Sequence, residues 1–159
     1  MERIEVDKLP ARVGALYPKP HAKRCARRKN TALGDAAGLT QFGVNLTRLK
    51  PGVWSSQRHW HTREDEFVWV LEGDVTLVTD GGRETLRAGD CAGFPAGVAN
   101  GHHFINESAA DAVFLTVGAR HPKDACHYPD IDMHAKPGRF DDRAVFVHKD
   151  GSPFPAEEG

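Results

Sequence analysis

Apolar residues alternate with polar ones through the middle of the chain, in short runs separated by glycine-rich turns. The segment FGVNLTRL places Phe42, Val44 and Leu46 on one face at a period of two, which is typical of a β-strand. Similar runs follow at 53–61, 66–73, 75–86, 88–97, 102–106 and 112–118, and the run at 75–86 contains the hairpin signal Asp80-Gly81-Gly82. No segment of ordinary length has the period of an amphipathic helix. The pattern therefore predicts an all-β barrel or sandwich.

The two ends of the chain differ from this middle part. Residues 1–38 are rich in Pro, Ala and basic groups, which predicts an extended N-terminal arm packed on the domain. After residue 119 the chain becomes irregular, and Val145 and Val147 indicate one last short strand. We therefore expect an arm at 1–38, a barrel at 39–119 and a C-terminal extension at 120–159 with a short final strand.

Composition excludes several classes of function. The 159 residues fit one domain, with 40% hydrophobic and 27% charged residues. A formal net charge of -1 favours neither nucleic acid nor a membrane surface as a partner, and no apolar run approaches a membrane span. The first residues lack the apolar core of a signal peptide, so we expect a cytoplasmic protein. The three cysteines form no C-x-x-C pair, which argues against a disulfide framework and a cysteine zinc cluster.

The stretch HWHTREDE, residues 59–66, carries the candidate chemistry. His59 and His61 lie two apart on a predicted strand, so both imidazoles point to one face. Glu66 can join them if residues 62–65 form a bend that resets the face of the next strand. Imidazole and carboxylate together suit Zn, Fe, Mn, Ni or Cu and can leave coordination positions open for substrate or water. A further ligand could come from His102 or His103.

Two spaced motifs resemble those of the cupins. The first motif consists of Gly52, His59-Trp60-His61, Glu66 and Gly73, and the second of Gly89, Pro95-Ala96-Gly97, His102 and Asn106. The second motif departs from the usual spacing, because Asn100 stands where a histidine is expected and the His-x-x-x-Asn tail comes two residues late. Either the turn is longer or Asn100 is the counterpart. We prefer the longer turn, because Asn100-Gly101 is itself turn chemistry.

This resemblance implies a single cupin (double-stranded β-helix, jelly-roll) barrel with extended N- and C-terminal arms. It implies one divalent transition metal (Zn, Fe, Mn or Ni) held by His59, His61, Glu66 and His102, with His103 and Asn100 as reserves. The whole chain resembles a group of small single-domain bacterial cupins, some of which carry the label of sugar-phosphate isomerases. The resemblance also implies a homodimer, for which the N-terminal arm could cover or exchange edge strands.

The function expected from this set is a metal-dependent enzyme that acts on a small polar metabolite, of oxygenase or isomerase type. Glu66 could also act as an acid or base if it is not firmly ligated. The alternatives are a non-catalytic module that binds a small molecule through its metal, and an isomerase-like cupin. Gln57 and Phe104 are the candidate substrate contacts. Glu64 and Asp65 are expected to be solvated loop acids, either of which could orient a ligand histidine.

Overall fold

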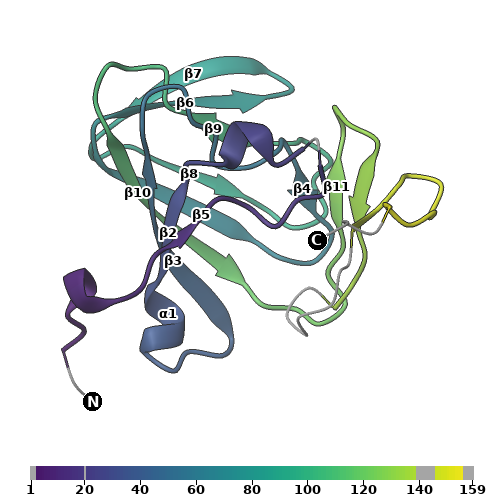
Figure 1. Cartoon of the computed structure of the whole chain (residues 1–159), viewed down its shortest axis with the longest axis horizontal. Coiled ribbons are helices and arrows are strands. Elements are labelled where there is room, and N and C mark those ends of the chain that lie inside the picture. The colour runs from purple at the N-terminus through teal and green to yellow at the C-terminus, as the bar shows by residue number, and fades with distance from the viewer. Residues whose placement is uncertain (1–2, 20, 139–145, 156–159) are drawn as a thin grey trace.

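The computed structural model describes residues 3–19, 21–138 and 146–155, and these form an almost entirely β structure (Figure 1). The strands are β1 (Arg12–Val13), β2 (Lys29–Ala32), β3 (Phe42–Leu49), β4 (Trp60–His61), β5 (Glu66–Glu72), β6 (Asp74–Thr79), β7 (Gly82–Arg87), β8 (Cys91–Phe94), β9 (His103–Ile105), β10 (Ala112–Ala119), β11 (Cys126–Tyr128), β12 (Met133–Ala135) and β13 (Phe146–Val147). The helical segments are η1 (Val6–Lys8), η2 (Lys23–Cys25) and α1 (Leu33–Ala36). Within the described residues, no helix is long and apolar enough to cross a bilayer.

Two antiparallel sheets enclose the core. The larger has the strand order β1-β2-β3-β10-β5-β8, and the smaller has the order β7-β6-β9. On β5, Val68 and Val70 are fully buried while Phe67 and Trp69 are exposed, which is the alternation of a strand covered on one face. The buried valines pack in one apolar cluster with residues of both sheets, among them Phe104 and Phe114.

The predicted hairpin is present, with β6 and β7 paired around Asp80 and Gly81. The run at 53–61 is less regular than the sequence suggests, because only Trp60 and His61 form a strand, β4. Upstream of β4 the backbone N–H groups bond outside any regular ladder. Trp54 donates to the Arg24 carbonyl at 3.1 Å and Ser55 to the Phe104 carbonyl at 2.8 Å. This segment therefore bends between the N-terminal part of the chain and β9.

The N-terminal residues add strands to the larger sheet. β2 pairs with β3, and β1 pairs in turn with β2. The Arg28 guanidinium donates from Nη1 to the Ser55 carbonyl at 2.6 Å and from Nη2 to the Gly14 carbonyl at 3.2 Å. These contacts fasten the beginning of the chain to the segment that leads into β4.

The C-terminal extension forms a third sheet with the order β13-β12-β11-β4. Figure 1 shows these residues, in green to yellow, beside β4 at one end of the barrel. The sequence predicts only a last strand here, at Val145 and Val147; Phe146–Val147 is β13, and Val145 lies outside the described residues. The sequence does not predict β11 and β12, because each has three residues, which are too few to show a period of two. Their buried Met133 and Tyr128 pack with Tyr17 from the N-terminal part of the chain.

Candidate metal centre

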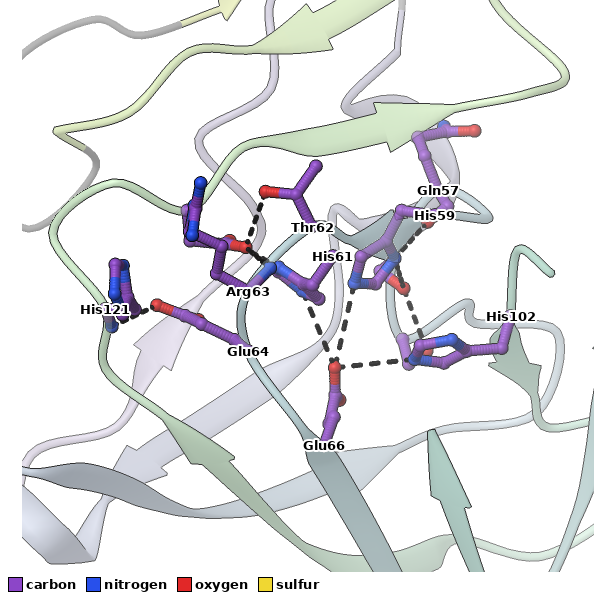
Figure 2. Close-up of polar contacts among 12 residues, drawn as sticks. Gln57, His59, His61, Thr62, Arg63, Glu64, Glu66, His102 and His121 are labelled. Carbon is purple, nitrogen blue, oxygen red and sulfur yellow. Dashed lines mark hydrogen bonds and ion pairs between the residues drawn. The ribbon is translucent and has the colours of Figure 1, made fainter. Parts of the chain in front are cut away.

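The fold brings three histidines and one carboxylate together, three of them from residues 59–66 and the fourth, His102, from a distant part of the chain (Figure 2). His61 lies in β4, His59 just before it, and Glu66 begins β5. His102 precedes β9 and pairs with His59 through two backbone hydrogen bonds of 3.1 and 2.8 Å. Residues 62–65 do not belong to a strand, which lets Glu66 point to the same side as the histidine pair.

One oxygen of Glu66 is the centre of this group. Oε2 lies 3.9 Å from Nε2 of His59, 3.7 Å from Nε2 of His61 and 3.4 Å from Nε2 of His102. Donor atoms that share one zinc-like cation at about 2.0–2.2 Å lie roughly 3 to 3.6 Å apart. The distances from Oε2 to His59 and His61 exceed this range by about a few tenths of an ångström, and the distance to His102 lies within it. His59, Glu66 and His102 also offer ligand atoms within 4.8 Å of one another, and His61 joins this group through its contact with Glu66. Imidazole nitrogen and carboxylate oxygen are also the donor types that such metals prefer.

Burial and mutual contact shift the pKa values of His59 and Glu66 in the directions that favour metal binding. Burial lowers the pKa of His59 to about 3, assisted by the neighbouring His102 and His61, so this imidazole is neutral at physiological pH. Burial on its own would raise the pKa of Glu66. The hydrogen bond from His102 and the nearby histidines outweigh it and lower that pKa to about 2. The site thus offers an ionised carboxylate beside a neutral imidazole.

Hydrogen bonds at the far side of two rings fix which nitrogen faces Glu66. Nδ1 of His59 lies 2.8 Å from the carbonyl of Gln57, and Nδ1 of His61 lies 2.7 Å from Oδ2 of Asp124. Because both partners are acceptors, each Nδ1 carries the proton and each Nε2 presents a lone pair to the centre. A carboxylate behind a ligand histidine is a common second layer of metal sites and raises the basicity of the imidazole.

Asp124 is a residue that sequence reasoning missed. It lies between β10 and β11 and is 2% exposed. Its Oδ1 accepts the backbone N–H of Arg63 at 2.8 Å and the hydroxyl of Thr62 at 3.3 Å, beside the bond to His61. No motif marks Asp124, because the contact depends on how the C-terminal extension pairs with β4.

His102 is held differently from the other two histidines. Its ring stacks on Phe94, with centroids 3.6 Å apart and planes at 6°. Its Nδ1 is buried and has no hydrogen-bond partner within the described residues. Aromatic packing therefore positions this ring, and its Nε2 is directed at Glu66.

The two reserve ligands, His103 and Asn100, make other polar contacts. Nδ1 of His103 is 3.0 Å from the carbonyl of Ser56, and its ring meets Trp54 edge-on. The side-chain oxygen of Asn100 accepts the backbone N–H of Asp80 at 2.9 Å. Among the described residues, His103 belongs to no cluster of His, Cys, Asp and Glu side chains with the spacing of metal ligands. Asn100 lies in the wall of a cavity that His61 and His102 also line.

The two candidate substrate residues, Gln57 and Phe104, both contact other parts of the protein. The amide of Gln57 donates to the carbonyl of His21 at 2.7 Å, which ties it to the N-terminal part of the chain. Phe104 is 2% exposed and belongs to the apolar core, where it packs against Phe94 and Phe114. Their contact with a substrate stays a prediction.

One of the two loop acids differs from expectation. Asp65 is exposed and accepts the N–H of Ala96 at 2.8 Å. Glu64 was expected in solvent, but it is 2% exposed and accepts the N–H of His121 at 2.7 Å. The bend at 62–65 turns Glu64 inward beneath the start of the C-terminal extension, so its carboxylate anchors that segment.

A small cavity adjoins the centre. Its volume is about 80 Å³, which exceeds the roughly 10–15 Å³ that one water molecule needs. The wall combines His61, His102 and Glu64 with apolar and neutral side chains, namely Trp60, Gly93, Phe94, Pro95, Val98 and Asn100. None of these lining residues is a lysine or an arginine. The cavity thus gives a small polar group access to the histidines.

Comparison with known proteins assigns the chain to a family. A family model described as Cupin domain matches residues 45–118. A sugar phosphate isomerase of the cupin superfamily from Silicibacter pomeroyi is 46% identical, with 98% of each chain covered and a TM-score of 0.89. A protein from Acidithiobacillus ferrooxidans, provisionally described as a sugar phosphate isomerase, is 30% identical, with 94% of this chain and 90% of that chain covered and a TM-score of 0.75.

More distant structures share the fold alone. The polyketide cyclase RemF from Streptomyces resistomycificus is 22% identical over 75% of this chain and 79% of that chain, with a TM-score of 0.60. None of the curated proteins compared with this chain matches it. The barrel, the spacing of its motifs and the two full-length relatives agree, and the chain belongs to the cupin superfamily.

Proposed function

We propose that His59, His61, Glu66 and His102 bind one divalent transition metal and that the chain is a metal-dependent enzyme for a small polar metabolite. The observation that carries this proposal is the position of Glu66 Oε2, within 3.4 to 3.9 Å of three Nε2 atoms. Four converging donors around a cavity are costly to maintain without a ligand, because each buried polar group loses its hydration.

The metal and the residues around it would have separate chemical roles. When bound, a divalent metal supplies a Lewis acid that polarises a substrate oxygen or lowers the pKa of water. Phe94, Pro95 and Val98 make part of the cavity wall apolar, which lowers the local dielectric constant and strengthens electrostatic interactions beside it. With Glu66 engaged as a ligand, we assign proton transfer to Glu64, whose carboxylate also lines the cavity.

The residues that line the cavity favour a substrate without a phosphate group inside it. Phosphate groups are usually held by arginine or lysine, and the described cavity wall contains neither. A compact metabolite with two neighbouring oxygens, such as a hydroxy or keto acid or a hydroxy ketone, fits a metal with open positions better. The reaction would then be an isomerisation or an oxygenation at the carbon that bears those oxygens.

A second candidate is isomerisation of a sugar phosphate. The supporting observation is the 46% identity to the Silicibacter pomeroyi protein over almost the whole chain. In this case the phosphate would extend out of the cavity, and only the carbonyl and hydroxyl end would reach the histidines.

Proton exchange separates these functions. Metal-loaded protein is incubated in D₂O with a panel of small hydroxy and keto acids, hydroxy ketones and sugar phosphates, and deuterium uptake is followed by NMR. Uptake beside the carbonyl of the non-phosphorylated compounds supports the first proposal, and uptake in sugar phosphates alone supports the second. Oxygen consumption by the iron form identifies an oxygenase. Saturable binding without any turnover would instead assign a non-catalytic binding module.

We also infer a homodimer through the outer face of the larger sheet. On β5, Phe67, Trp69 and Leu71 are exposed by 41%, 49% and 39%. The paired strands β10 and β3 continue this face with Leu115 and Leu46 in register with Trp69. An apolar surface continuous over three strands suits a second copy related by a two-fold axis. Light scattering should give twice the chain mass, and Trp69→Glu should give the monomer.

A further inference from the structure

Cys126 faces the metal centre from the C-terminal extension. It is the first residue of β11, directly opposite His61 in the β4–β11 pair. Side chains of a cross-strand pair lie on the same face of the sheet. The neighbouring pair, Trp60 and His127, therefore occupies the opposite face, where the two rings stack with centroids 4.3 Å apart. The register of these short strands thus directs the thiol toward the histidines.

The thiol lies within the reach of two proposed ligands. The sulfur of Cys126 and one ring nitrogen each of His59 and His61 all lie within 4.8 Å of one another. The residue is 2% exposed. Zn–S bonds of about 2.3 Å are longer than Zn–N bonds of about 2.0–2.1 Å, so a sulfur donor tolerates a wider spacing. His59 consequently belongs to two groups with metal-ligand spacing, one with Glu66 and His102 and one with His61 and Cys126.

We propose that Cys126 is a ligand of the metal in this centre, bound as a thiolate when the ion is of borderline or soft character, such as zinc, cobalt or cadmium. The proposal rests on the metal centre proposed above. On binding, a metal–sulfur bond replaces the S–H bond, and the proton leaves to solvent. Thiolate favours zinc-like ions over manganese or magnesium, which prefer oxygen. Cys126 would therefore set which metal the protein selects.

No motif in the sequence marks Cys126 as a metal ligand. Cys126 belongs to no C-x-x-C pair, and it lies beyond residues 45–118, which match the family model. The two other cysteines supply controls. Cys25 is also buried and Cys91 is exposed, and neither belongs to a cluster with metal-ligand spacing among the described residues.

Cobalt reports a bound thiolate by an intense charge-transfer absorption in the near ultraviolet. Metal-free protein is titrated with Co²⁺ while this band and the weaker visible bands are recorded. We expect the charge-transfer band in the wild type, in Cys25→Ser and in Cys91→Ser, and its loss in Cys126→Ser. A band that survives in folded Cys126→Ser overturns the proposal.

Wild-type protein alone also decides the question, should Cys126→Ser fail to fold. The NMR shift of bound cadmium moves strongly downfield with a thiolate ligand and should do so here; a shift typical of nitrogen and oxygen donors alone overturns the proposal. Cobalt that binds without a charge-transfer band overturns the thiolate and leaves the proposed centre intact. Protein that binds neither cobalt nor cadmium overturns both.

Discussion

Nδ1 of His61 lies 2.7 Å from Oδ2 of Asp124, although the two residues are 63 positions apart in the chain. The bond joins the barrel strand that carries a proposed ligand to the C-terminal extension. It also holds the proton on Nδ1, so that Nε2 is free to bind metal. The extension is thus part of the proposed centre.

Asp124→Asn should weaken metal binding. The amide has one acceptor oxygen, so it can accept either the His61 proton or the Arg63 N–H, which bond to different oxygens of Asp124. It also no longer supplies the negative charge that makes the imidazole more basic. We expect a loss of affinity of about 10- to 100-fold, the range found when such outer partners are changed. Competition with a chelator of known affinity measures it.

The matched control is Asp65→Asn, because Asp65 is exposed and its carboxylate accepts the backbone N–H of Ala96. Its metal affinity should stay within about twofold of the wild type, since surface changes of this kind usually act within ±0.5 kcal/mol. Equal affinities of all three proteins would show that Asp124 does not act on the metal.

Adjacent histidines should behave differently on substitution. His102→Ala removes an Nε2 that lies 3.4 Å from Glu66, so bound metal should fall well below the wild-type amount. His103→Ala removes a ring that packs on Trp54 and bonds to Ser56, so it should lower thermal stability and largely spare the metal. Elemental analysis and thermal unfolding together separate the two effects. Metal loss in His103→Ala with retention in His102→Ala would reverse the assignment.

The barrel and the first half of the centre could be predicted from the sequence, because both follow from local patterns. Strand β3 shows its period of two directly in Phe42, Val44 and Leu46. His59, His61 and Glu66 stand in one short stretch. The choice between His102 and His103 needed the spacing to Asn106. The backbone pairing of His102 with His59 places its side chain by the centre.

The contribution of the C-terminal extension could not be predicted. β11 and β12 are too short to show a period, and Asp124 and Cys126 act through the pairing of β11 with β4. Glu64 was expected in solvent for a related reason. Its burial depends on the His121 N–H, which a distant segment brings over it. Such long-range contacts cannot be predicted from a local pattern of apolar and polar residues.

The two glycines that frame the first motif should differ in their tolerance of alanine. Both have positive φ, +77° at Gly52 and +68° at Gly73, which costs a residue with a side chain about 1–2 kcal/mol. At Gly73 an added Cβ would also lie 2.5 Å from the Asp111 carbonyl oxygen, whereas at Gly52 nothing lies within 4 Å.

Urea unfolding should therefore show a larger loss of unfolding free energy for Gly73→Ala than for Gly52→Ala. The excess should be about 1 kcal/mol or more, because the crowded backbone at Gly73 has to shift. Identical midpoints for the two variants would mean that the backbone around Asp111 yields without cost.

Metal content tests the central claim most directly. The protein is purified without a metal-affinity tag, and transition metals are measured before chelation, after chelation and after reloading. We predict about one equivalent per chain that is lost on chelation, restored on reloading and accompanied by a rise in thermal stability, since a ligand bound only to the folded state stabilises it. Less than about a tenth of an equivalent at every stage, with no change in stability, would contradict the proposed centre.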